Sequence, residues 1–142
     1  MNTTQDAVRT ESDRDRPSKL QSRIGLGLTV LLTLFFLFDA VPKLLSMSWV
    51  VEPSVKLGFT AGFVPVIGAL LAIGLVLYLI PRTSVFGAVF ITAYLGGAVC
   101  TNVLAKLPLF GFVLAPVYTA ILLWLALYLR STALRRLVRT GF

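Results

Sequence analysis

The fold is decided by two apolar runs, GFVPVIGALLAIGLVLYLI (62–80) and SVFGAVFITAYLGGAVCTNVL (84–104), which the short joint PRT (81–83) connects. Each run is close to the roughly 20 residues that an α-helix needs to cross a bilayer. Neither run contains a formal charge. Both are too long for the strands of a β-barrel, and neither alternates between apolar and polar residues as a strand does. This stretch therefore predicts two transmembrane helices, which the short joint makes antiparallel neighbours.

Two further apolar runs extend this pattern on both sides. The first covers residues 24–45, and the last covers 109–129 after another short joint at 105–108. We therefore expect an all-α membrane protein, a four-transmembrane-helix bundle over residues 24–130. Pro116 lies inside the last run, and proline has no N–H to bond the carbonyl one turn earlier. The sequence thus predicts a bend in this helix and an unbonded carbonyl near Phe112.

The connection between the first and second runs, residues 46–61, is longer than the other two. It mixes apolar residues such as Trp49 and Phe59 with Glu52, Pro53 and Lys56. This mixture favours either a short interfacial helix that starts at Pro53 and lies on the membrane surface, or an ordered loop. The sequence leaves both interpretations open.

Composition restricts the chemistry. The 142 residues are 57% hydrophobic and 13% charged, a balance that a water-soluble core of this size cannot bury. Histidine is absent and Cys100 is the single cysteine, which excludes Ser-His-Asp and Cys-His catalysis and argues against a transition-metal or haem site. The formal charge of +7 comes from cations beside the apolar runs, so it indicates contact with the lipid bilayer and not with nucleic acid. We assign no catalytic or metal-binding residue and expect a non-catalytic role, although the sequence does not decide whether the protein is an enzyme.

Lysine and arginine also predict the orientation. They are frequent in the polar tail 1–23, the joint at Arg82 and the basic tail 131–142 with the adjoining Arg130, whereas the opposite side carries Lys43, Lys56 and Lys106. Cytoplasmic segments carry the excess of these residues. We therefore predict a multi-pass protein of the plasma (inner) membrane with both tails in the cytoplasm.

Polar residues gather at the predicted outer end of the bundle. Asp39 and Lys43 are four residues apart, so in a helix they share a face and can form an ion pair. The helical rise places Asn102 of the third run at a similar depth. We predict a ligand pocket bounded by these three residues, with Tyr94 and Tyr118 deeper in the membrane as its floor. A neutral quinone or a lipid carbonyl would suit the Asn102 amide, and a solvated rim without a ligand is the alternative.

Small residues mark the expected contacts between helices, because lipid provides no hydrophobic drive for association. Gly25, Gly68, Gly96 and Gly97 are the glycines that we expect at such contacts.

Several short motifs are distributed along the chain: FDA (38–40), LGF (57–59), LYLIPRT (77–83), YLGGAV (94–99) and PVY (116–118). With these motifs, of which LYLIPRT and YLGGAV are the most specific, residues 24–137 resemble the DoxX-like family of small bacterial membrane proteins. This resemblance implies a four-helix membrane bundle. Some relatives in the wider DoxX group are subunits of a thiosulfate:quinone oxidoreductase or associate with redox partners. The family often has histidine at the position of Asn102, and an amide does not titrate, so a proton-transfer role does not carry over.

Three functions remain open at this stage. The first is a non-catalytic membrane subunit or scaffold of a redox-related complex, with a redox partner protein or as a homo-oligomer. The second is a quinone- or lipid-binding component of a membrane oxidoreductase, with a quinone as the one cofactor to consider. The third is a small transporter, which four spans would support only as an oligomer.

Overall fold

The computed structural model describes residues 18–132, 134, 135 and 138. Within them, four helical segments are long and apolar enough to cross a membrane: Lys19–Leu44, Ala61–Leu79, Ser84–Leu104 and Leu109–Arg130. The described residues contain no β-strand. The protein is therefore an all-α membrane protein with four spans, as the sequence predicts. Most of the proposed tails, 1–23 and 131–142, lies outside the described residues.

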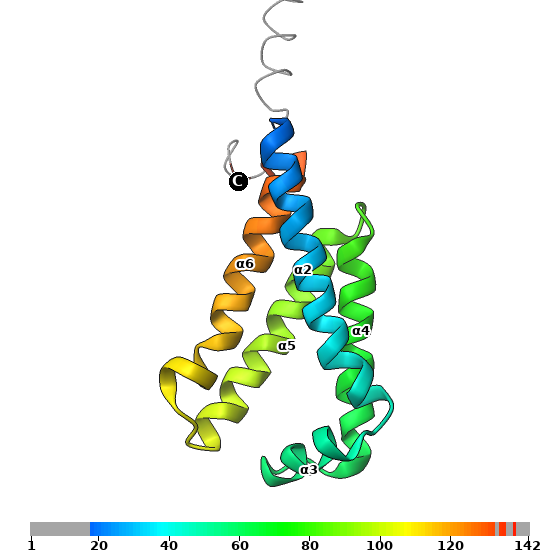
Figure 1. The fold of residues 1–142 in the computed structure, drawn as a ribbon, viewed down its shortest axis with the longest axis vertical. Coiled ribbons are helices and arrows are strands. Elements are labelled where there is room, and N and C mark those ends of the chain that lie inside the picture. Colours follow the sequence, from blue (N-terminus) through cyan, green and yellow to red (C-terminus); the bar gives the residue numbers. More distant parts are fainter. Residues whose placement is uncertain (1–17, 133, 136–137, 139–142) are drawn as a thin grey trace, which may run out of the picture.

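The spans form a four-helix bundle. Helix α2 (Lys19–Leu44) and helix α5 (Ser84–Leu104) each pack against both α4 (Val64–Leu79) and α6 (Ala115–Arg130), so α2 and α5 occupy opposite corners. The described ends of the chain lie together, and the Arg135 guanidinium donates to Gln21 Oε1 at 3.2 Å across them. Figure 1 shows α3 (Ser48–Lys56) crossing the other end of the bundle, which we call the α3 end. The helices are close together near the described termini and diverge toward the α3 end.

Helix α2 begins earlier than the apolar run indicated, at Lys19 and not at residue 24. Ser18 and Gln21 form a capping box, in which each side chain bonds the backbone N–H of the other residue. This pair satisfies two N–H groups that the helix start would otherwise leave unbonded, so the helix extends through polar residues 19–23.

The segment between α2 and α4 is helical, which decides between the two interpretations of residues 46–61. The predicted start at Pro53 is wrong, because α3 begins at Ser48. The N–H groups of Val50 and Val51 both bond Met47 O at 3.0 Å, so the first turn closes before the proline is reached. A single turn of 3₁₀ helix, η1 (Ala61–Phe63), then leads into α4.

The fourth span is broken, as Pro116 predicts. A π-helical turn, η2 (Leu109–Val113), is followed by Leu114 and then by α6, with the proline in the first turn of α6. The break turns η2 away from the axis of α6 at the α3 end (Figure 1).

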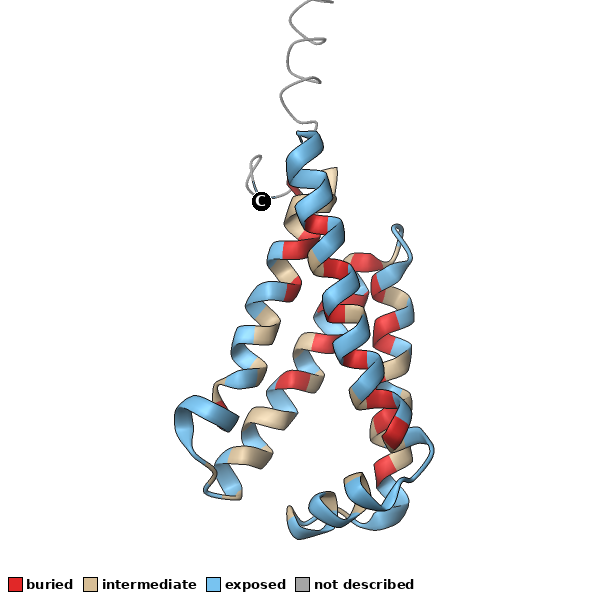
Figure 2. Cartoon of the chain, in the orientation of Figure 1, coloured by how far each residue is buried: buried red, intermediate tan, exposed pale blue. Residues whose placement is uncertain are grey.

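The core lies along the inner faces of the four helices (Figure 2). Its largest fully buried side chains include Tyr78, Phe36, Leu71 and Ile91. Among the glycines, Gly87 makes the closest approach to another helix, since an added Cβ would lie 2.2 Å from Tyr78 N. Large apolar side chains such as Phe86 cover the outer faces, which fits a surface that contacts lipid.

Candidate binding site

A polar cluster of Asp39, Lys43 and Tyr94 lies inside the bundle toward the α3 end. Lys43 Nζ is 2.7 Å from Asp39 Oδ1 and 2.6 Å from Oδ2, which confirms the predicted ion pair. The same ammonium donates to Tyr94 Oη at 2.9 Å, and the Tyr94 hydroxyl donates to Asp39 Oδ2 at 3.0 Å. The three side chains thus form a closed set of hydrogen bonds between α2 and α5, the helices at opposite corners.

The local sequence explains how this cluster forms. Asp39 and Lys43 are one turn apart on α2, so their side chains lie on one face. Gly68 of α4 packs directly against that turn, since an added Cβ would lie 2.8 Å from Lys43 Cβ and 3.0 Å from Ala40 O. A larger residue at 68 would hold α4 away from the lysine, so the glycine contributes to closing the site.

Charges and protons within the cluster are balanced. The three contacts of Lys43 match the three N–H donors of an ammonium, and the tyrosine hydroxyl has one donor, which Asp39 accepts. The lysine side chain is 16% exposed and that of the aspartate 39%. One positive and one negative charge in contact leave the cluster neutral, as a group near the hydrocarbon must be to avoid a large desolvation cost.

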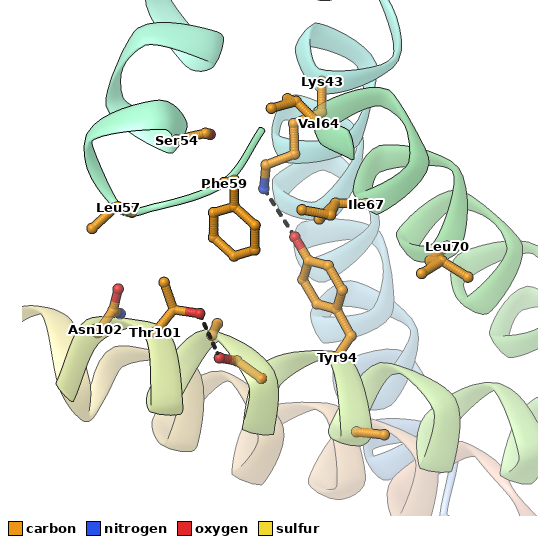
Figure 3. A pocket seen from close by; sticks show the side chains of 13 residues that line it. Lys43, Ser54, Leu57, Phe59, Val64, Ile67, Leu70, Tyr94, Thr101 and Asn102 are labelled. Atoms are coloured by element: carbon orange, nitrogen blue, oxygen red, sulfur yellow. Dashed lines mark hydrogen bonds between the residues drawn. The ribbon is translucent and has the colours of Figure 1, made fainter. Parts of the chain in front are cut away.

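Two cavities lie on either side of this cluster. The larger, of about 400 Å³, extends between α5, α4 and the segment around α3. The smaller, of about 370 Å³, extends between α2, α5 and the η2–α6 break. Lys43, Tyr94, Ala98 and Asn102 line both cavities. Figure 3 shows the larger cavity, with Ser54 and Phe59 on one side, Thr101 and Asn102 on another, and the Lys43–Tyr94 hydrogen bond at its edge.

Asn102 has a structural partner. Its Nδ2 donates to Phe112 O at 2.8 Å. This carbonyl is four residues before Pro116, which has no N–H to bond it. The asparagine therefore satisfies the carbonyl that the proline leaves unbonded, and it ties α5 to the η2–α6 break. Its Oδ1 atom is not used in this contact.

Comparison with known families matches residues 27–126, most of the chain, to the DoxX-like family. This chain belongs to the DoxX-like family. The matched range includes every residue of the polar cluster and the cavity-lining residues Ala98, Thr101 and Asn102 of α5. Comparisons with curated proteins and with solved structures found no match.

The predicted site residues of this DoxX-like chain are brought together in part. Asp39, Lys43, Tyr94 and Asn102 all line the smaller cavity, although they come from two different helices. Tyr118 does not join them: it lines neither cavity and is 50% exposed. The prediction that Tyr118 forms part of the pocket floor is therefore wrong, because the rotation of α6 turns this side chain outward.

Sequence reasoning missed the contribution of the α3 segment in this family member. Ser54, Leu57 and Phe59 line the larger cavity. They reach it because the chain reverses at Gly58, whose φ of 95° is a conformation that favours glycine. The N–H of Phe59 closes this turn by bonding Ser54 O at 3.1 Å. The LGF motif (57–59) was the available signal.

The described residues contain no group of three or more His, Cys, Asp and Glu side chains that could hold a metal ion. The site offers two partly open, mostly apolar spaces beside a neutral polar cluster. Such a site can bind and orient a small molecule.

Proposed function

We propose that this DoxX-like protein is a non-catalytic membrane subunit that binds a neutral amphiphile, such as a quinone or a lipid, at the α3 end of its bundle. The observation that carries the proposal is the neutral Asp39–Lys43–Tyr94 cluster with a mostly apolar cavity on each side. Small-molecule sites typically occupy about 300–1,000 Å³ and combine apolar walls with a few fixed polar groups. Both cavities fall in that range at about 400 and 370 Å³.

The arrangement of protons supports binding without catalysis. General acid–base catalysis needs a group that can give a proton to the substrate or take one from it. The ammonium of Lys43 and the hydroxyl of Tyr94 already donate within the cluster. A charged ligand would have to displace one partner of the ion pair, and this exchange would leave the other charge poorly solvated. A neutral ligand avoids both costs.

The cellular setting completes the proposal. Four spans bring the two ends of a chain to the same side of a membrane. The described ends of this chain do lie together at one end of the bundle. The distribution of lysine and arginine then assigns that side to the cytoplasm and the α3 end to the outer face of the plasma (inner) membrane. Some relatives in the wider DoxX group are subunits of a redox enzyme or associate with redox partners, so we expect a redox partner protein or a homo-oligomer as the assembly in which the bound molecule is used.

Native mass spectrometry of the protein extracted in mild detergent tests this function, because it reports bound small molecules and partner chains together. We expect a bound neutral amphiphile in the wild type. Ala98→Phe fills the wall that both cavities share and should abolish its retention. Val103→Phe is the matched control, since Val103 is on the same helix, is 55% exposed and lines neither cavity. Equal occupancy in wild type and Ala98→Phe would refute the proposed site.

A further inference from the structure

The side-chain donors around the larger cavity are almost all engaged within the protein. Lys43 and Tyr94 donate within the polar cluster. The hydroxyl of Ser54 donates to Val50 O at 2.7 Å, and that of Thr101 donates to Gly97 O at 2.9 Å. Among the described residues of the cavity wall, the second N–H of the Asn102 amide is the side-chain donor that these bonds leave over.

Acceptors, in contrast, remain available on the same wall. A hydroxyl oxygen has two lone pairs, so Ser54 Oγ and Thr101 Oγ1 keep both after donating their protons to backbone carbonyls. Tyr94 Oη accepts from Lys43 and keeps a second lone pair. Asn102 Oδ1 adds another acceptor. The polar part of the cavity therefore offers several acceptors against one donor.

The apolar wall of the larger cavity extends away from the α3 end, along α4 and α5. Leu70 of α4 and Ala93 of α5 line the cavity, and both residues are exposed. The cavity is therefore open along α4 and α5, one to two helical turns or more further from the α3 end than Asn102. A molecule in it would place its head among the acceptors near the α3 end and its apolar body toward the bilayer.

We infer that the larger cavity is a site for a neutral amphiphile that carries a hydroxyl group, such as a phenol, a hydroquinone or a lipid alcohol. A molecule with a carbonyl or ether head fits this wall less well, so of the two forms of a quinone the reduced form, with its hydroxyl groups, suits the larger cavity. This inference rests on the proposed function and specifies the ligand chemistry of the same site. The hydroxyl donates to the acceptors of Thr101, Ser54 or Asn102, for which the wall supplies only one uncommitted side-chain donor, the second N–H of Asn102. A carbonyl oxygen only accepts hydrogen bonds, so it would face the lone pairs of these acceptors without bonding them. Its one possible side-chain donor on this wall is the second N–H of Asn102.

The test compares para-nonylphenol with its methyl ether, which has the same apolar body and no donor. Binding of each probe to the full-length protein in nanodiscs is measured by isothermal titration, with partition into empty nanodiscs subtracted. We expect the phenol to bind about fivefold to tenfold more tightly, the net effect of one hydrogen bond. Ala98→Phe should remove specific binding of both probes.

Two matched variants locate the acceptor. Thr101→Val removes a hydroxyl from the larger cavity, whereas Thr119→Val makes the same change in the smaller one, where the hydroxyl likewise donates to its own helix. We expect Thr101→Val to reduce the preference for the phenol over the ether by about twofold or more and Thr119→Val to leave it unchanged.

The possible results separate this inference from the proposed function. If phenol and ether bind equally, and Ala98→Phe abolishes both, the cavity binds amphiphiles but the preference for a hydroxyl is refuted. A preference for the phenol that Thr101→Val does not change also refutes the inference, because the acceptor would then lie elsewhere. If neither probe binds more to the protein than to empty nanodiscs, the proposed function fails, and the inference fails with it.

Discussion

Asp39→Ala should destabilise the bundle more than its partly exposed position indicates. Asp39 accepts two hydrogen bonds from Lys43 and one from Tyr94, so its removal leaves the ammonium with Tyr94 as its one remaining partner in the cluster and leaves the tyrosine hydroxyl without its acceptor. A hydrogen bond to a charged group contributes about 1.5–3 kcal/mol, and a buried charge left without its partner costs about 3–5 kcal/mol. The aspartate side chain is 39% exposed, and water there weakens these interactions, whereas the lysine is only 16% exposed. We therefore expect the free energy of unfolding to fall by about 2–3 kcal/mol.

The coupling is measured with a double mutant. Lys43→Met removes the charge that Asp39→Ala would leave unpaired, so the variant with both changes should recover part of the loss. Unfolding of the purified proteins is followed by circular dichroism as sodium dodecyl sulfate is titrated into mild-detergent micelles. Glu52→Ala is the control, because Glu52 is an exposed acid of α3 and its removal should change stability little. If Asp39→Ala and the double variant unfold at the same point, the two side chains are not energetically coupled and our reasoning about the cluster is wrong.

Two further predictions concern packing and orientation. Gly87→Ala should lower the melting temperature in detergent, because its Cβ would lie 2.2 Å from Tyr78 N, whereas Gly96→Ala should not, because nothing lies within 4 Å of the position of its Cβ. Equal melting of the two variants would contradict the close approach of α4 and α5. Reporter fusions at Met1 and Phe142 should both give a cytoplasmic signal, and an external signal from either terminus would overturn the orientation that the lysine and arginine distribution predicts.

The parts of this structure that follow from local geometry were predictable from the sequence. The four spans follow from the length of the apolar runs. The Asp39–Lys43 ion pair follows from a spacing of four residues on one helix. The carbonyl of Phe112 lacks its helical hydrogen bond because Pro116 has no N–H, and Asn102 bonds it instead. The helical rise also placed Asn102 near the depth of Asp39, and both line the smaller cavity.

Rotation of each helix about its axis was not predictable in the same way. The sequence predicts the same place for Tyr94 and Tyr118, the floor of the pocket, yet the first joins the cluster and the second is 50% exposed. The glycines also show that the sequence does not predict which face of a helix turns inward. Gly25 and Gly68 lie at helix contacts as expected, but Gly96 and Gly97 have no neighbour within 4 Å of an added Cβ, and the closest contact is at Gly87. Uniformly apolar helices carry little periodicity, so long-range packing decides which face turns inward.

Asn102 links the packing of the bundle to its proposed function. The resemblance to the DoxX-like family implies that histidine is common there, and histidine can both bond a carbonyl and carry a proton. Asn102 retains the first property, since its Nδ2 donates to Phe112 O at 2.8 Å and ties α5 to the broken fourth span. It lacks the second, because an amide does not titrate near neutral pH. Beside a neutral cluster whose protons are already engaged, this residue gives the cavities one more uncharged acceptor, which suits a site that binds a neutral molecule and does not transfer its protons.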